Sequence, residues 1–107
     1  MRIDVMDRGG KATKPLRNYV GLRLMSVLDH LVRGVNGVAV SVTDVHDPDG
    51  EGGKRCRMLA LLAPSGQARV EGTDSDLYGA IDRAAEELAH AVALQLSQPG
   101  TAARSRE

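Results

Sequence analysis

The chain has 107 residues, and its 14 basic side chains are balanced by 14 acidic ones. Hydrophobic residues make up 42% of it, but Phe and Trp are absent and Tyr occurs twice. This composition excludes a second domain of ordinary size, offers no net charge to attract nucleic acid, and nearly excludes a surface that stacks nucleobases. No run approaches the ~20 apolar residues of a membrane-spanning helix, and the N-terminus MRIDVMDRGG lacks the apolar centre of a signal peptide. We therefore expect one cytoplasmic domain over residues 1–98, no membrane contact, and a disordered polar tail over residues 99–107.

The N-terminal half predicts a strand, a helix and a second strand. Apolar residues alternate with polar ones over residues 2–6, which is the pattern of a short strand. Pro15 suits the first turn of a helix, and apolar side chains recur at helical spacing, so we expect an amphipathic helix over residues 15–33 that ends near Gly34. From Val38 to Asp44 the period changes to two, which predicts the second strand.

The C-terminal half predicts two more strands and a second helix. Residues 54–63 and residues 67–72 again alternate, with a Pro-Ser-Gly turn between them. The sequence TDSD at residues 73–76 offers N-cap side chains for a helix that follows. Apolar residues at helical spacing place this helix over residues 75–97, and Pro99 ends it.

The order of these elements, β-α-β-β-β-α, defines the expected fold. The first strand, helix and second strand form a crossover unit with parallel strands, whereas short turns join the last three strands into an antiparallel meander. Each helix has one apolar stripe, so both are expected to cover the same face of the sheet. The predicted fold class is α+β, with a four-stranded mixed sheet and two helices packed on one face.

The only cysteine, Cys56, is flanked by the cations Lys54, Arg55 and Arg57. Cations can activate a thiolate, but neighbours along a strand point to opposite faces, and no base is identifiable for this thiol. Cys56 shares its face with Met58, and free cysteines are among the most buried residues. We interpret Cys56 as a core residue and take the flanking cations as the better functional lead.

The loop DVHDPDGEGG at residues 44–53 carries acids that suggest a calcium site. Positions one and twelve of an EF-hand loop would however fall on Val45 and Cys56, which do not fit. His46 and Cys56 give two soft ligands, fewer than the four of a structural zinc site. We expect a solvated loop without metal or other cofactor. The sequence also has no nucleophile elbow, phosphate-binding loop or dinucleotide fingerprint, so we expect no enzymatic activity.

Charges fall in blocks along the chain although the total cancels. Residues 1–40 hold seven cations against three acids, and residues 54–70 hold four cations and no acid. Residues 71–90 hold six acids and one arginine. A local excess of one sign sets the nearby electrostatic field, so these blocks predict a surface with distinct basic and acidic patches.

One flank of the first predicted helix gathers polar side chains at spacings of three and four residues: Tyr19, Arg23, Ser26, His30 and Arg33. Together with the cations of residues 54–57, this flank would suit a surface that binds phosphates by backbone shape and not by base identity. The same spacing is equally typical of a flank that only faces solvent.

Three segments in order carry a family resemblance: the helix YVGLRLMSVLDHL, the segment DVHDPDGEGGKRCR and the helix start DLYGAIDRAAEEL. From residue 2 to about residue 96 the chain resembles the ribosome hibernation-promoting factors, also called ribosome-associated translation inhibitors, in their short form. The resemblance implies the β-α-β-β-β-α fold and a stress protein that binds rRNA of the small ribosomal subunit and inhibits translation. From the position and type of each residue, the candidate phosphate contacts are Arg23, Arg33, Lys54, Arg55, Arg57, Arg83 and, in a pH-dependent manner, His90.

The chain departs from the family pattern at two places. Residues 46–48 read His-Asp-Pro where the family commonly has Asn-Gly-Pro. The second helix of the family usually carries a run of basic residues at positions that match Arg83, Glu87, His90 and Leu94, of which only Arg83 is a fixed cation here. Because affinity for RNA scales with the number of phosphates neutralised, we expect weaker binding with a smaller dependence on salt.

The alternative is a divergent member that keeps the fold and acts as a protein-interaction or homodimeric module. Leu59 and Leu61 are predicted on the sheet face opposite the helices, where an apolar patch would provide a pairing surface. The acidic second helix offers another surface to a protein partner.

Overall fold

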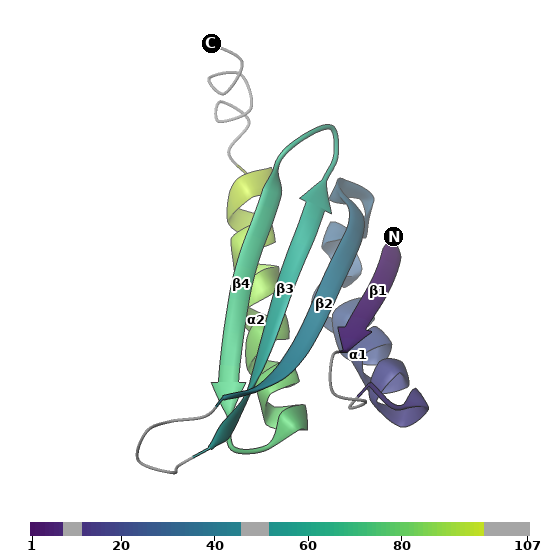
Figure 1. Cartoon of the computed structure of the whole chain (residues 1–107). Coiled ribbons are helices and arrows are strands. Elements are labelled where there is room, and N and C mark those ends of the chain that lie inside the picture. The colour runs from purple at the N-terminus through teal and green to yellow at the C-terminus, as the bar shows by residue number, and fades with distance from the viewer. Residues whose placement is uncertain (8–11, 46–51, 98–107) are drawn as a thin grey trace.

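The helices and strands follow one another in the predicted order β-α-β-β-β-α, with an additional 3-10 helix after the first α-helix (Figure 1). A computed structural model describes residues 1–7, 12–45 and 52–97. The elements are β1 (Arg2–Asp7), α1 (Lys14–Val27), η1 (Asp29–Gly34), β2 (Val35–Val45), β3 (Gly53–Leu62), β4 (Gln67–Asp74) and α2 (Leu77–Leu96).

The strands form a mixed sheet in the order β1-β2-β3-β4. β1 runs parallel to β2, whereas β2, β3 and β4 are antiparallel neighbours, which confirms the predicted crossover and meander. Val40 pairs with Met58, and Met58 with Val70, so side chains of one parity line up in rows across the sheet. Figure 1 views the sheet from one face, with α1 and α2 behind it. We call the face without helices the open face.

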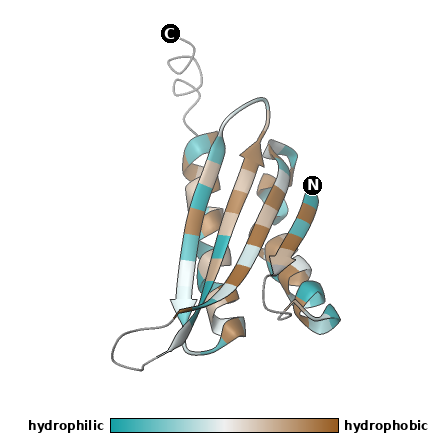
Figure 2. Ribbon diagram, viewed as in Figure 1, coloured by the Kyte–Doolittle hydropathy of each residue, from teal (hydrophilic) through white to brown (hydrophobic). Residues whose placement is uncertain are grey.

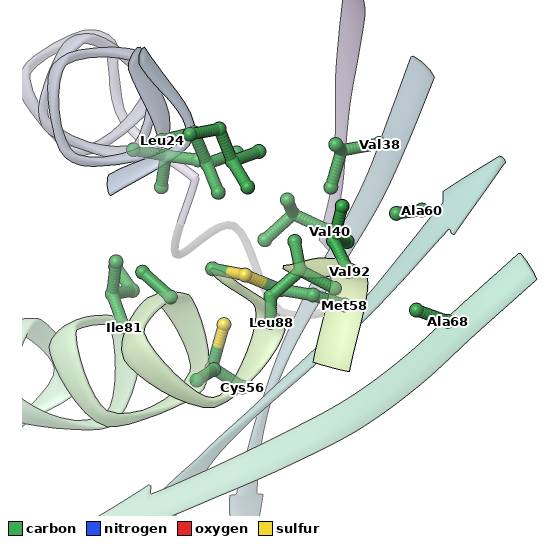
Figure 3. Packing of buried hydrophobic residues seen from close by; sticks show 14 of the residues in the cluster. Leu24, Val38, Val40, Cys56, Met58, Ala60, Ala68, Ile81, Leu88 and Val92 are labelled. Atoms are coloured by element: carbon green, nitrogen blue, oxygen red, sulfur yellow. The ribbon is translucent and has the colours of Figure 1, made fainter. Parts of the chain in front are cut away.

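The core lies between the sheet and the two helices. Along the strands, apolar residues that face the helices alternate with more polar residues on the open face, as the changing colours in Figure 2 show. Side chains from α1, from α2 and from the strands meet in this core (Figure 3): Leu24, Val38, Val40, Cys56, Met58, Ala60, Ala68, Ile81, Leu88 and Val92. Cys56 is 0% exposed, which confirms its interpretation as a core residue.

The first helix begins as predicted but ends early. Thr13 is the N-cap, and its hydroxyl oxygen accepts a hydrogen bond from the backbone N–H of Leu16 at 3.4 Å. Pro15 lies in the first turn, where its missing N–H costs nothing because that donor has no partner inside the helix. The helix ends at Val27, so the prediction of one helix over residues 15–33 is wrong in its last part.

A 3-10 helix replaces the last predicted turns. The N–H of Leu28 donates to the carbonyl of Leu24 at 2.9 Å, and the N–H of Leu31 then donates to the carbonyl of Leu28 at 2.8 Å. The second bond spans three residues, which is the tighter pattern of a 3-10 helix. Apolar residues three apart, such as Leu28 and Leu31, face the same way in both helix types, so their spacing does not distinguish them.

The second strand is longer than predicted. It begins at Val35, which pairs with Leu62, and a register irregularity separates this pair from Gly37 and its partner. The irregularity breaks the strict alternation from which the start at Val38 was predicted. β4 likewise extends two residues beyond its predicted end, to Asp74.

The second helix starts at an acidic cap and lies close to β4. Asp76, from the predicted TDSD cap sequence, accepts a hydrogen bond from the N–H of Gly79 at 3.1 Å. On β4, a Cβ added to Gly72 would lie 2.6 Å from the backbone nitrogen of Ala84 and 2.8 Å from the carbonyl oxygen of Ala80. Only glycine therefore allows α2 to approach the strand this closely.

Two predicted segments, the loop within residues 46–51 and the tail over residues 99–107, lie outside the described residues. Among the residues that are described, no helix is both long enough and apolar enough to cross a membrane.

Candidate nucleic-acid interface

The cations of residues 54–57 are divided between the two faces of the sheet. Arg55 and Arg57 alternate with the buried Cys56, so both lie on the open face. Lys54 has the parity of Cys56 and lies on the face that the helices cover. The segment therefore does not present its three cations to one ligand.

Arg55 and Arg57 share one carboxylate on the neighbouring strand. The Nε atoms of Arg55 and Arg57 lie 3.4 and 3.5 Å from the two carboxylate oxygens of Glu71. The Nε of Arg55 is buried and makes no hydrogen bond among the described residues. Two guanidinium groups are thus balanced by one carboxylate at distances longer than a strong charge-assisted hydrogen bond.

Lys54 is held at the end of the β2–β3 hairpin. Its Nζ lies 2.6 Å from Oδ1 of Asp44, and both side chains are about one-third exposed (34% and 30%). Asp74 is its register partner on β4, so Lys54 lies between two acids. A phosphate at this site would compete with carboxylates that are already in place.

Arg23 belongs to a network that joins α1 to α2. Its Nε lies 2.9 Å from Oδ1 of Asp82, and its terminal nitrogen lies 3.4 Å from Glu86. The hydroxyl of Tyr19 donates to the same Asp82 oxygen at 2.6 Å, and the ring of Tyr19 packs edge to face against Tyr78 with centroids 4.8 Å apart. The hydrogen bond to Asp82, burial and the negative charge of Asp82 together raise the pKa of Tyr19.

Arg83 lies on the exposed side of α2 and pairs with the end of β4. Its Nε donates to Oδ2 of Asp74 at 3.1 Å, while two-thirds of the Arg83 side chain (67%) stays exposed. The backbone N–H of Asp76 donates to the other oxygen of Asp74 at 3.1 Å. These two hydrogen bonds, that of Asp76 first, lower the pKa of Asp74.

Arg33 and His90 are exposed and make no ion pair among the described residues. Arg33 lies in the last turn of η1, so the flank predicted on one continuous helix is interrupted after α1. His90 lies on α2, and the charged residues that precede it on this helix are predominantly acidic: Asp82, Glu86 and Glu87 against Arg83. The loss of basic residues predicted for the second helix is thus a loss on an exposed face.

Arg69 is a site residue that the sequence-based prediction omitted. It pairs with Leu59 across β3 and β4, which places it on the open face beside Arg57, and no ion pair joins it to a carboxylate in the part of the chain that the structure describes. The turn at residues 63–66 sets this register, so alternation counted from the turn would have revealed the position.

The described residues include possible metal ligands and one thiol. Across residues 1–7, 12–45 and 52–97, no three side chains of His, Cys, Asp or Glu are grouped so that they could hold a metal ion. Burial raises the pKa of the Cys56 thiol to about 12, so this group is not a thiolate near neutral pH.

Comparison with known proteins assigns the chain to a family. The model of the family described as "Sigma 54 modulation protein / S30EA ribosomal protein" matches residues 3–95. The chain therefore belongs to this family, which confirms the resemblance found in the sequence. No protein of curated function matches the chain significantly.

One solved structure supports the same assignment, and a second shares the fold. The N-terminal domain of Protein Y from Thermus thermophilus is 31% identical, with a TM-score of 0.62, over 86% of this chain and 96% of that one. A ribosomal subunit interface protein from Coxiella burnetii is 14% identical, with a TM-score of 0.74, over 91% of this chain and 99% of that one. The second likeness shows a shared fold.

Proposed function

We propose that this protein binds the small ribosomal subunit through its rRNA and inhibits translation under stress, the hibernation role predicted from the sequence. The observation that carries the proposal is the family match over residues 3–95. The 31% identity to the Protein Y domain adds support, since nearly all of that domain is covered. Binding to ribosomes would place the protein in the cytoplasm, and the proposed role requires no catalysis.

We assign the RNA contacts to the helix-covered side of the sheet. Arg23, Lys54, Arg83 and His90 lie on this side, and Arg33 lies at the end of η1. Arg55 and Arg57 are on the open face, so the sheet and α2 lie between them and the outer side of α2. One flat RNA surface that touches Arg83 cannot also touch Arg57, so the seven predicted contacts divide into two groups.

The ion pairs on the helix-covered side reduce RNA binding without preventing it. A guanidinium has five N–H donors, and Arg83 uses one of them on Asp74, so donors remain for a phosphate. Exposed ion pairs contribute only about 0–1 kcal/mol, so exchanging a carboxylate for a phosphate costs little. The carboxylates of Asp74, Asp82 and Glu86 nevertheless stay beside the incoming phosphates and repel them. We therefore expect binding with a low affinity and a shallow salt dependence.

The experiment is cosedimentation with purified small ribosomal subunits over a salt series. The double variant Arg33→Ala/Arg83→Ala removes two cations from the proposed RNA side. The matched control Arg57→Ala/Arg69→Ala removes two from the open face. The proposal expects the first pair to weaken binding and to reduce the slope of log K against log salt by about 0.9 per lost contact, while the control resembles the wild type. Equal effects of both pairs would contradict the assignment to one side.

A second candidate function is supported by exposed apolar side chains on the open face. Leu61 is 50% exposed and Met6 is 57% exposed, and no helix covers them. This is the surface through which the sequence predicted a protein-interaction or homodimeric module. Mass measured over a concentration series tests the homodimer, which Leu61→Lys would then dissociate.

A further inference from the structure

The open face of the sheet is a shallow concave surface of mixed character. A hollow of about 520 Å³ on it is lined by Met6, Ser41, Arg57, Leu59, Arg69 and Glu71, among others. These residues come from all four strands, so the hollow crosses the sheet and is not a gap at its edge. Figure 1 shows no element in front of these strands.

Within the described strands, the open face carries more cations than acids. Arg2, Arg55, Arg57 and Arg69 lie on it, against Asp4 and Glu71. The Arg2–Asp4 pair is highly exposed (83% and 59%) and lies on the edge strand. What remains towards β3 and β4 is three arginines around the single carboxylate of Glu71. This group lacks a counter-charge that a carboxylate from another molecule would supply.

The outward side chains of β3 change from cationic to apolar along the strand. Their order is Arg55, Arg57, Leu59 and Leu61, and Arg69 stands beside Leu59. Arg57 and Arg69 are diagonal neighbours of an antiparallel pair, about 7–8 Å apart at the backbone. That separation is close to the spacing of alternate side chains in an extended segment, about 7 Å. One short peptide segment could thus place two carboxylates on the arginines and an apolar side chain on Leu61.

We infer that the open face is a docking site for an acidic segment of another protein that also carries apolar side chains. Arginine and methionine are both enriched at the core of protein interfaces, and the exposed Met6 and Leu61 add apolar area beside the arginines. RNA phosphates could pair with the arginines, but they would leave the apolar half of the face without contacts. The described strands also offer no aromatic ring on which a base could stack. The inference goes beyond the ribosome role and does not depend on it.

A second copy of this chain is a poorer occupant. Two open faces placed against each other would bring four arginines and two acids from each copy into one interface. Like charges placed opposite each other weaken an interface, so the charge excess that attracts an acidic segment opposes pairing of two copies. The experiment must therefore also detect a homodimer if one forms.

The test begins with random peptides displayed on phage and selected on the immobilised wild-type chain. The inference expects enrichment of sequences that combine Asp or Glu with Leu, Ile, Val or Met. A synthetic peptide of the enriched sequence is then titrated into the ¹⁵N-labelled chain. Its amide shift changes should map to β1, β2, β3 and β4 on the open face and leave α2 unchanged. Enrichment of basic or uncharged peptides, or shift changes confined to the helices, would overturn the inference.

Matched variants and two further probes complete the test. Arg57→Ala/Arg69→Ala should lower the affinity for the peptide at least about tenfold, whereas Arg33→Ala/Arg83→Ala should leave this affinity unchanged. Both pairs lie at the surface, and their spectra and melting temperatures will show whether the fold is kept. A short duplex RNA that shifts the open-face amides and displaces the peptide would show that this face binds RNA, and would overturn the inference. A doubled molecular mass of the chain in solution, which would indicate a homodimer, would overturn it as well. Ribosome cosedimentation is measured separately on the same proteins, so a failure here is distinct from a failure of the proposed function.

Discussion

Replacing Gly72 by alanine should separate α2 from β4. The new Cβ would lie 2.6 Å from the nitrogen of Ala84, 2.8 Å from the carbonyl oxygen of Ala80 and 2.9 Å from the Cβ of Arg83. Two of these atoms belong to the helix backbone, so the helix itself must move by several tenths of an ångström. Overpacking of this kind costs about 1–3 kcal/mol. For a domain of this size, each kcal/mol lowers the melting temperature by about 4–8 °C.

Gly21→Ala is the matched control because the same substitution is expected to raise the stability of the fold instead of lowering it. Gly21 lies within α1, and a Cβ added there meets nothing within 4 Å. Alanine is favoured over glycine inside a helix by about 0.5–1 kcal/mol, so this variant should melt at a higher temperature than the wild type. Thermal and urea unfolding followed by circular dichroism measure both. If Gly72→Ala is as stable as the wild type, α2 does not lie on β4 as described.

Three further predictions follow from the pKa shifts. The Cys56 thiol is buried, and its pKa is raised to about 12. It should therefore not react with a disulfide reagent at pH 8 until denaturant unfolds the chain. Rapid reaction of Cys56 in the folded protein would contradict its burial. The raised pKa of Tyr19 means that its hydrogen bond to Asp82 stabilises the fold below about pH 10 and is lost as the phenol ionises. Tyr19→Phe should therefore lower the free energy of unfolding by about 1 kcal/mol at pH 7 and by less in strong alkali. The lowered pKa of Asp74 means that its carboxylate stabilises the fold above about pH 3.9 and ceases to do so as the pH falls through the lowered pKa. Asp74→Asn should therefore lower the melting temperature at pH 7, and the difference from the wild type should shrink as the pH is lowered. A difference that does not depend on pH would contradict the role of the Asp74 charge.

The fold could be predicted because its signals are local. Alternation along residues 54–62 separates Cys56 and Met58 from Arg55 and Arg57, and the structure has the same division. The Asp76 cap is likewise visible as a local acidic sequence before an apolar stripe. The end of α1 could not be predicted, because residues three apart remain on one side in both an α-helix and a 3-10 helix.

The electrostatic state of the candidate site was much harder to predict. Arg23 is 59 positions from Asp82 in the sequence, and only the packing of α1 beside α2 brings their side chains to 2.9 Å. The sequence therefore shows cations but not the carboxylates that already neutralise them. Arg69 shows the converse, because its place beside Arg57 depends on the register across the β3–β4 hairpin. The charge available to a ligand is a property of the fold and not of the residue list.

The measurement that tests the central claim most directly is cosedimentation of the wild-type chain with isolated small ribosomal subunits, first at low salt and then at increasing salt, with isolated large subunits in parallel. The account predicts saturable binding to the small subunit that weakens as salt rises, with a slope that corresponds to a few phosphate contacts. No binding to the small subunit at the lowest salt, or equal binding to both subunits, would contradict it.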